Sequence, residues 1–526
     1  MGVTVLKPPV SVSGIWDKVL WGLSLAMILM GLSVRIVAFM YNRSLWLDEA
    51  MLASSLVQRD YLGLLLPLDY NQGAPIGYLW ITKTLIYLFG SSEYILRLPS
   101  MLAGMASVPL FWFVLKRVFD DPRPWVGTAF FATIPLLINY SLELKPYMLD
   151  GMITLLSVYL FHLALNKKIK TGLLMTYCAA VTWFSFPSIF PVAAFCLAWF
   201  GRSAFRSNKE EMVRSLAVGM VALISFSLNY LAFFHNLENN LSRPFWQQIR
   251  FPLVPGGVED LMLIKTMAGH YLHSFGRSAI FLVGAMSAGS LSLFLIKKHH
   301  GFLVFTLIAL ALLFTASYMG YYGMLRRLLL FLVPLHLLIV MALYREIHTR
   351  WRTSAIVLGF AIVLINIGSA RMFFPNYVYR SNLEGNPLIE HIKADKDQTP
   401  VYLYHLNIAQ YEYKTGYRMG PWRRLQAGPF YHQGAIYGSW YDFVSYDEPY
   451  IRRRVNDPVR LSQNVAAIEK HDRTYLLLGH CPPEQKMALL NALKKTGTVT
   501  EVKRVYDTPL FLFERTKRIG EIQLDP

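Results

Sequence analysis

The sequence predicts a polytopic α-helical membrane protein with a small α/β domain at its C-terminal end. Two observations favour this fold class: 54% of the 526 residues are hydrophobic, and only 16% are charged. A soluble globular protein has about 25% charged residues. A third observation is the pattern, because long apolar runs alternate with short basic clusters along most of the chain. We therefore expect several helices that cross a membrane.

The charge of the chain does not indicate nucleic-acid binding. The formal net charge is +18, but a nucleic-acid-binding domain gathers its basic residues into one patch. Here they recur between apolar runs, as the positive-inside rule produces. The three cysteines, Cys178, Cys196 and Cys481, form no Cys-x-x-Cys pair, so neither a zinc site nor a disulfide framework is indicated.

The apolar runs predict about eleven spans, because a helix needs about 20 apolar residues to cross the hydrocarbon. The first run is too long for the apolar part of a cleavable signal peptide, so it is expected to be an anchoring span. The expected spans are residues 20–40, 98–116, 124–141, 148–165, 172–186, 187–201, 213–234, 277–296, 301–319, 326–344 and 352–371.

One further apolar run, residues 75–90, decides the topology. It is short and contains Lys83, which favours a helix in the interface over a span. If it does not cross, every basic cluster lies on the side of the N-terminus, as the positive-inside rule requires. We therefore expect a cytoplasmic N-terminus and outer-interface helices within 41–96. The clusters are at 116–124, 166–170, 201–214, 297–300 and 344–352.

Two domains are expected, a transmembrane domain over residues 1–375 and an extracytoplasmic α/β domain over residues 376–526. Beyond the last span the composition becomes polar, and helical and alternating patterns follow one another. Helices are expected at 386–395 and 483–495, and strands at 400–405, 474–480 and 509–515.

An adjacent acidic pair, Asp48 and Glu49, follows the first span on its outer side. Ionisable groups beside a span are costly unless they have partners or a function. The pair could cap the helix that "SLWLDEAMLASSL" begins, or it could act on a substrate. Two acids exceed what one cap needs, which favours a functional role.

A second outer loop, "LELKPYMLD", carries further polar groups at the start of a span. Lys145, Tyr147 and Asp150 lie within it. The alternative to a functional role is a structural Lys145–Asp150 ion pair or a lysine that reaches toward the headgroups. Together with the acidic pair, this loop gathers carboxylates at one outer rim. Such an arrangement suits a general base that takes a proton from a hydroxyl nucleophile.

Four arginines could supply the opposite charge on the outer side, because a guanidinium binds phosphate in a fork geometry. Anchoring to lipid headgroups is the alternative for each. No GxxxxGK[ST], HExxH or GxSxG motif is present, so a nucleotide pocket and zinc- or serine-dependent hydrolysis are not indicated. The arginines are Arg243, Arg250, Arg326 and Arg327.

Four motifs resemble those of the GT-C glycosyltransferases that use polyprenyl-phosphate sugars. They are "SLWLDEA" after the first span, "NQGAPIGYLWI", "RLPS" and "KPYMLD". The nearest patterns are the protein O-mannosyltransferase-like group and the bacterial lipid A aminoarabinose transferase. The resemblance covers residues 15–165 well and is weaker beyond them. It implies the GT-C fold and a polyprenyl-phosphate sugar donor.

The resemblance also implies roles for single residues. Asp48 resembles the catalytic base, Asp150 a second acid, and Arg250 the arginine that holds the lipid phosphate. Glu49 would orient the acceptor or hold a divalent ion, whose need the sequence leaves open. Where the aminoarabinose transferase has a lysine before a proline, this chain has Ala74, which argues against aminoarabinose transfer to lipid A. The expected substrate-binding residues are Lys145, Tyr147, Arg243, Arg250, Arg326 and Arg327.

The predicted function is therefore inverting transfer of a sugar to a hydroxyl of an extracytoplasmic glycan, lipid or protein, by an enzyme of the plasma (inner) membrane. One rival is a secondary transporter, which predicts charges near the middle of the membrane and repeat symmetry. Another is a non-enzymatic protein of cell-envelope assembly that binds the lipid carrier. Transfer assays with labelled polyprenyl-phosphate sugars distinguish the three.

Overall fold

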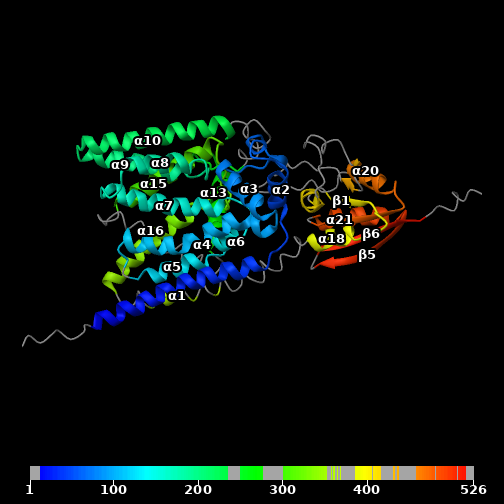
Figure 1. Ribbon diagram of the computed structural model, residues 1–526, viewed down its shortest axis with the longest axis horizontal. Helices are drawn as coiled ribbons and strands as arrows, with labels where there is room; N and C mark the ends of the chain where they lie inside the picture. Colours follow the sequence, from blue (N-terminus) through cyan, green and yellow to red (C-terminus); the bar gives the residue numbers. More distant parts are fainter. Residues whose placement is uncertain are drawn as a thin grey trace, which may run out of the picture.

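The computed structural model consists of a helical bundle and a C-terminal α/β domain that lies against one end of it (Figure 1). It describes residues 12–121, 123–234, 249–275 and 300–351, single residues between 353 and 368, and residues 385–516. Within the last range it leaves out 405–406, 416–429, 433–434, 438–457, 480 and 506–507. The protein is mostly helical, with one small sheet, as the sequence predicts.

The bundle is built from long apolar helices, five of which, among the described residues, are long and apolar enough to cross a membrane. The expected spans 277–296 and most of 352–371 lie outside the described residues, so the number eleven stays a prediction. The bundle helices are α1 (Val12–Met40), α4 (Glu93–Arg117), α5 (Pro124–Thr133), α6 (Pro135–Ser141), α7 (Tyr147–Leu165), α8 (Thr171–Val181), α9 (Ile189–Phe205), α10 (Lys209–Asn229), a π-helical turn (Tyr230–Phe234), α13 (Val258–Leu272), η5 (His273–Phe275), α15 (His300–Tyr318) and α16 (Leu332–Arg350).

The run expected as a single span at 124–141 is broken into α5 and α6. Pro135 has no N–H and begins α6, so carbonyls at the end of α5 need donors from elsewhere. Arg35 of α1, which is fully buried, donates to the carbonyl of Ala132 at 3.0 Å and to Ser141 Oγ at 3.2 Å. This arginine inside the first span stabilises the break.

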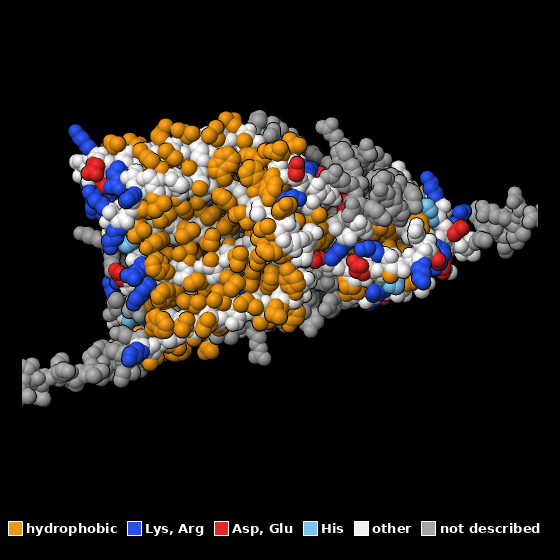
Figure 2. Space-filling view, in the orientation of Figure 1, with side chains coloured by type: hydrophobic (Ala, Val, Ile, Leu, Met, Phe, Trp, Pro, Cys, Tyr) orange, Lys and Arg blue, Asp and Glu red, His pale blue; other side chains and the backbone are white. Residues whose placement is uncertain are grey.

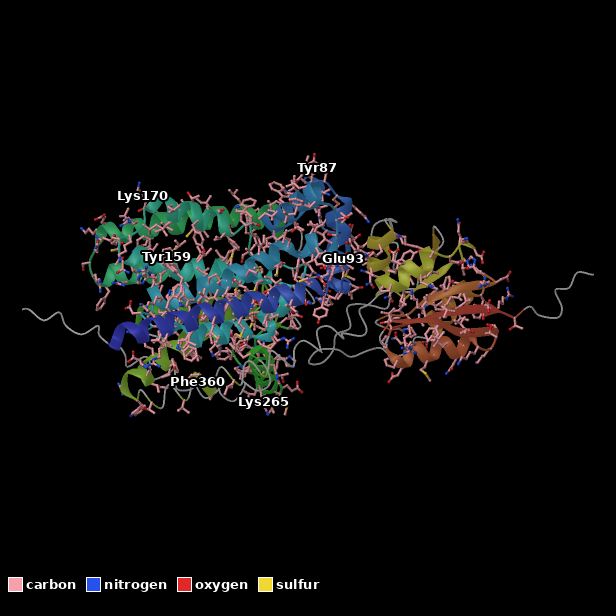
Figure 3. All side chains as sticks on the ribbon, turned by 60° about the horizontal axis from the view of Figure 1, so that its bottom comes forward. Tyr87, Glu93, Tyr159, Lys170, Lys265 and Phe360 are labelled. Carbon is pink, nitrogen blue, oxygen red and sulfur yellow. The ribbon has the colours of Figure 1, made fainter. Side chains whose placement is uncertain are left out.

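Charged side chains gather at the end of the bundle that is farther from the C-terminal domain, beyond an apolar belt that covers its middle (Figure 2). Contacts join the basic loops at this end: Arg345 donates to the carbonyl of Phe119 at 2.6 Å, and Arg214 to Thr171 Oγ1 at 2.9 Å. In Figure 3, Lys170 lies toward this end and Glu93 next to the C-terminal domain. The side of the membrane that each end faces stays a prediction.

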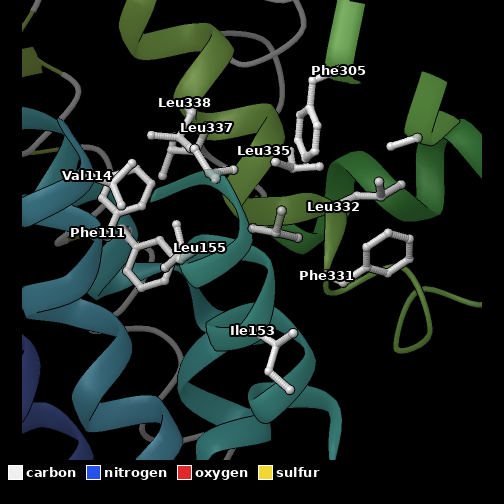
Figure 4. Packing of buried hydrophobic residues seen from close by; sticks show 14 of the residues in the cluster. Phe111, Val114, Ile153, Leu155, Phe305, Phe331, Leu332, Leu335, Leu337 and Leu338 are labelled. Carbon is white, nitrogen blue, oxygen red and sulfur yellow. The ribbon is translucent and has the colours of Figure 1, made fainter. Parts of the chain in front are cut away.

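The core of the bundle is apolar and closely packed. Aromatic and aliphatic side chains of α4, α7 and α16 meet there, with Phe305 of α15 beside them (Figure 4). Phe111 of α4 stacks on Phe131 of α5, with ring centroids 4.5 Å apart. Between helices in a membrane, such side chains stabilise the bundle through van der Waals packing. This rigid bundle carries the polar groups at its ends.

Short helices within residues 41–96 cover the end of the bundle next to the C-terminal domain, and their place in an outer interface stays a prediction. The helix over residues 75–90 is present, but it is too short to be counted among the candidate spans. It packs closely at Gly77, whose N–H donates to the carbonyl of Trp183 at 2.9 Å. These elements are α2 (Leu47–Gln58), η1 (Gly63–Leu65), η2 (Asp69–Asn71) and α3 (Ile76–Phe89).

The C-terminal domain contains a six-stranded sheet of order β2-β3-β1-β4-β6-β5. β1 pairs in parallel with β3 and β4, and the other pairs are antiparallel. The five elements expected from the sequence are present, but α19, α20, β2, β3 and β5 were not predicted. The elements are α18 (Asn386–Lys393), β1 (Val401–Leu403), α19 (Ile408–Thr415), β2 (Phe430–His432), β3 (Ala435–Tyr437), α20 (Pro458–Ile468), β4 (Arg473–Leu477), α21 (Pro483–Leu493), β5 (Gly497–Val505) and β6 (Thr508–Arg515).

Helices cover both faces of this sheet. Val401 and Leu403 face a cluster that includes α18 and α19, whereas Tyr402 faces α20 and α21. This alternation follows from the two-residue period of a strand. The face with α18 and α19 is the one that meets α2 and α3, because their side chains share one buried cluster.

Candidate functional site

The two carboxylates of the acidic pair have different surroundings, although both lie in the first turn of α2. Glu49 is fully buried. Its carboxylate accepts two bonds from Arg97, both at 2.8 Å, and one from the N–H of Trp46 at 3.2 Å. The bond from Trp46 caps the start of the helix. Glu49 therefore performs the capping role that the sequence offered for the pair, and Asp48 does not.

Glu49 also joins the start of α2 to the loop that precedes α7. Its carboxylate accepts from the N–H of Leu144 at 2.8 Å, and Arg43 lies 3.4 Å from both Glu49 and Glu143. Burial alone would raise the pKa of Glu49, but Arg97 and Arg43 outweigh it and lower this pKa to about 2. A carboxylate with this many partners has no free position for a substrate or an ion. The expectation that Glu49 orients the acceptor or holds a metal is not supported by this geometry.

Asp48 is held by one arginine from a distant part of the chain. Its Oδ2 accepts from Nη1 of Arg327 at 2.7 Å, and both side chains remain partly exposed, 18% for Asp48 and 28% for Arg327. Arg327 lies in the turns before α16. The partial exposure of the ion pair leaves the Asp48 carboxylate accessible. Asp48 can therefore accept a proton from a neighbouring group.

Lys145 lies beside this pair. It is buried, its Nζ donates to Oε1 of Gln72 at 2.6 Å, and its carbonyl accepts from Ser100 at 2.7 Å. Burial lowers the pKa of Lys145, and the nearby Asp48 carboxylate counteracts this. The expected alternative of a Lys145–Asp150 ion pair is not formed. A buried ammonium with an amide partner can bind an anion.

Tyr147 and Asp150 lie in the first turn of α7, where Asp150 is buried and Tyr147 is half-buried. Tyr147 interacts electrostatically with Arg327 and Asp48, and Asp150 with Tyr147 and Tyr78. The structure therefore brings six of the expected site residues to one end of the bundle. They are Asp48, Glu49, Lys145, Tyr147, Asp150 and Arg327.

Of the other three arginines expected at the site, the two in the described part of the chain form no hydrogen bond or ion pair with the Asp48–Arg327 pair. Arg250 and Arg326 are exposed, and Arg243 lies outside the described residues. The backbone on both sides of Arg250 is fixed, because the carbonyl of Ile249 accepts from Met324 N at 3.1 Å and Phe251 N donates to Ser317 at 2.9 Å. These two bonds hold the backbone at Arg250 against the segment that leads to Arg326 and Arg327.

Two residues of the site were not identified from the sequence, Arg97 and Gln72. Both lie inside motifs that carry the family resemblance, "RLPS" and "NQGAPIGYLWI". An arginine in the first turns of a span is itself a signal, because it needs a partner. Gln72 gives no such signal. Among the residues that the structure describes, no group of three His, Cys, Asp or Glu could hold a metal ion.

Comparisons with known proteins point to one group. Residues 73–231 match the family model "Dolichyl-phosphate-mannose-protein mannosyltransferase". The fold is similar to the crystal structure of ArnT from Cupriavidus metallidurans bound to undecaprenyl phosphate, with TM-score 0.54, 11% identity, and coverage of 96% of this chain and 98% of that one. The apo structure of ArnT gives TM-score 0.40 and 13% identity over the same shares. No curated protein matches the sequence.

Proposed function

We propose that this chain, a membrane protein with the GT-C fold whose residues 73–231 match a mannosyltransferase family, transfers a sugar from a polyprenyl-phosphate donor to a hydroxyl of an extracytoplasmic acceptor. The observation that carries the proposal is the position of Asp48. It is the accessible carboxylate of the acidic pair and lies 2.7 Å from Arg327. A base and a cation side by side suit a reaction in which a hydroxyl attacks and a phosphate leaves.

The reaction forms one bond and breaks one bond at the anomeric carbon. The acceptor oxygen attacks this carbon while its proton passes to Asp48. The bond between the anomeric carbon and the phosphate oxygen breaks, and the polyprenyl phosphate leaves with the electron pair. Attack from the face opposite the leaving group inverts the configuration. General base catalysis of this kind contributes about 10²- to 10⁴-fold to the rate.

The departing phosphate needs positive charge, which Arg327 and Lys145 would supply. Arg327 would bind it through a charge-assisted hydrogen bond, and Lys145 would add a buried ammonium within electrostatic reach of Asp48. Arg250 and Arg326 would contribute from the exposed side, and Arg243 is carried over from the resemblance alone. Fixed donors at the site of developing charge give the largest gain in such enzymes. Lys145 would compensate for Ala74, where the aminoarabinose transferase has its lysine.

The other two acids would have supporting roles. Glu49 would position α2 and hence Asp48, because its carboxylate is saturated by Arg97, Trp46 and Leu144. Asp150 would orient the acceptor together with Tyr147, since both lie in the first turn of α7 and Tyr147 interacts electrostatically with Asp48 and Asp150. ArnT of Cupriavidus metallidurans binds undecaprenyl phosphate, and we infer a lipid carrier of this class here.

The test compares the wild type with Asp48→Asn in purified, detergent-solubilised protein. Labelled polyprenyl-phosphate sugars and a membrane extract as the acceptor source are supplied, and transfer is measured. Asparagine keeps the size of aspartate but cannot take a proton, so turnover should fall about 10²- to 10⁴-fold. Donor binding should persist, because the phosphate-binding groups are intact.

Three outcomes contradict the proposal. Activity of Asp48→Asn within a few-fold of the wild type would exclude Asp48 as the base. Donor binding without transfer by the wild type would favour a non-enzymatic carrier-binding protein. Movement of the intact donor across a proteoliposome membrane without transfer would favour a transporter.

A further inference from the structure

The C-terminal domain packs directly on the helix that carries the acidic pair. One buried cluster contains Leu52 and Leu56 of α2 together with Ile408 and Tyr411 of α19. α2 lies at the end of the bundle that faces the domain (Figure 1). The two parts of the chain therefore share a core at this point.

A first polar link reaches the backbone just before Asp48. Nε2 of Gln410 in α19 donates to the carbonyl of Leu45 at 3.3 Å, and the N–H of Asn386 donates to Ser44 Oγ at 3.3 Å. Gln410 is itself buried. It also fits closely against Gly385, where an added Cβ would lie 2.3 Å from Gln410 Oε1. The segment 44–45 is thus held by α19 and α18 on one side and by Arg97 on the other, since Arg97 also donates to the carbonyl of Ser44 at 3.2 Å.

A second polar link reaches Lys145 through the loop that precedes α3. The hydroxyl of Tyr70 donates to Glu412 of α19, and both side chains are buried. Two residues after Tyr70, Gln72 accepts the bond from Lys145. The position of Glu412 therefore determines where the amide that holds Lys145 can lie.

This loop has a conformation that needs such support. Tyr70 has φ +57°, in the left-handed region that costs a non-glycine residue free energy unless its surroundings fix it. Asp69 is fixed from the α2 side by Ser55 at 3.1 Å and by Arg59 at 2.6 Å. Tyr70 is fixed from the other side by Glu412. The loop is therefore held between α2 and α19.

We propose that α19 is a positioning element of the active site, which places Asp48 through Gln410 and Lys145 through Glu412, Tyr70 and Gln72. This inference rests on the proposed function for the roles of Asp48 and Lys145. Residues that fix catalytic groups from behind are needed because a displacement of about 1 Å can cost about 100-fold in rate. Gln410 and Glu412 are positioning residues, since neither contacts the reacting atoms.

The first test removes the link to Lys145 in the full-length protein. Glu412→Leu should raise the donor KM about tenfold with little change in kcat, because a displaced Lys145 loses about one charge-assisted bond. Glu412→Gln keeps an acceptor for Tyr70 and should restore the KM to within about twofold of the wild type. If Glu412→Leu does not fold, Tyr70→Phe removes the same bond by the loss of one oxygen.

The second test removes the link to Asp48. Gln410→Leu should lower kcat about tenfold and leave the donor KM unchanged, because the general base shifts while the phosphate-binding groups stay in place. A matched control is Arg473→Ala, which breaks an exposed ion pair with Glu514 at the edge of the domain, 3.2 Å long. This control should leave both constants unchanged.

Hydrogen exchange without substrate keeps the inference separate from the proposed function. Gln410→Leu should speed exchange at residues 44–50, and Glu412→Leu at residues 70–73, with β5 unchanged in both. If the wild type transfers no sugar, the proposed function has failed, and exchange alone decides the inference. Unchanged exchange, or a lower Tm with unchanged kcat and KM, would show that α19 only stabilises the fold.

Discussion

Two polar clusters lie side by side at the end of the bundle next to the C-terminal domain, and they differ in burial and in the number of their hydrogen bonds. The Glu49 cluster, formed with Arg97 and Arg43, is buried, and its carboxylate accepts four hydrogen bonds. The Asp48 cluster, formed with Arg327 and Lys145, is partly exposed at the ion pair, and its lysine is bound to the neutral Gln72. The first arrangement fixes a structure, and the second leaves charges that a substrate can use.

The comparison shows why adjacent carboxylates can have separate roles. Successive residues of a helix point about 100° apart, so α2 directs Glu49 into the protein and Asp48 toward Arg327. A buried carboxylate needs every lone pair satisfied, which removes Glu49 from chemistry. Because Glu49 caps the start of α2, the Asp48 carboxylate is left for the proposed role as general base.

The largest effect on stability is expected from a substitution that breaks the Glu49 cluster. Glu49→Ala leaves Arg97 and Arg43 buried without their carboxylate, and loss of one partner of a buried pair costs about 3–5 kcal/mol. We expect a marked fall in Tm and little folded protein, measured by fluorescence-detected size exclusion in detergent. Asp48→Ala, at the exposed pair, should fold normally. Equal Tm values for the two variants would contradict the distinction between the clusters.

Acid should act on the same cluster by protonating Glu49. Because its folded-state pKa is about 2, below its usual value, Glu49 contributes stability that is fully present above about pH 4.3 and is lost as the pH falls toward 2. Melting curves of the wild type, measured about every half pH unit between pH 6 and pH 3, should show this loss of stability. Glu49→Gln should flatten the acid dependence, and an unchanged slope would contradict this assignment.

The sequence singled out most polar residues of the candidate site but not the partners that each of them has. The acidic pair and Lys145, Tyr147 and Asp150 were found because ionisable groups beside a span require an explanation. Which member of the pair caps α2 could not be found, because the choice depends on Arg97, 48 residues away in sequence. Such tertiary contacts leave no local pattern.

The same reasoning explains which elements of the fold were predicted and which were missed. Long apolar runs predicted the helices of the bundle, and strong alternation predicted β1, β4 and β6. β5 was missed because it is half exposed at the sheet edge, so its residues are largely polar. The break before Pro135 was missed because the apolar run continues through it, and the bonds from Arg35 to Ala132 and Ser141 are tertiary contacts.

A substitution of Arg327 tests the Asp48 cluster. Arg327→Ala should raise the donor KM or lower kcat by about 10- to 100-fold, since it removes a charge-assisted bond worth about 1.5–3 kcal/mol. Its neighbour Arg326 is exposed and provides a matched control of the same residue type. Donor titration with both variants is the measurement. An equal effect of Arg326→Ala would mean that general basicity of the segment, and not the pair with Asp48, binds the donor.

The smallest effect is expected at Arg250, which the family resemblance assigned to the lipid phosphate. Its side chain is exposed, and exposed charge pairs contribute only about 0.2–1 kcal/mol. Arg250→Ala should therefore weaken donor use about two- to fivefold, less than Arg327→Ala, and Arg250→Lys should be near the wild type at low salt because the charge is kept. The effect should shrink in 0.5 M salt, where the Debye length is about 4 Å. The loss from Arg250→Ala could instead be as large as that from Arg327→Ala and insensitive to salt. This outcome would mean that Arg250 enters the site when the donor binds and belongs to the Asp48 cluster.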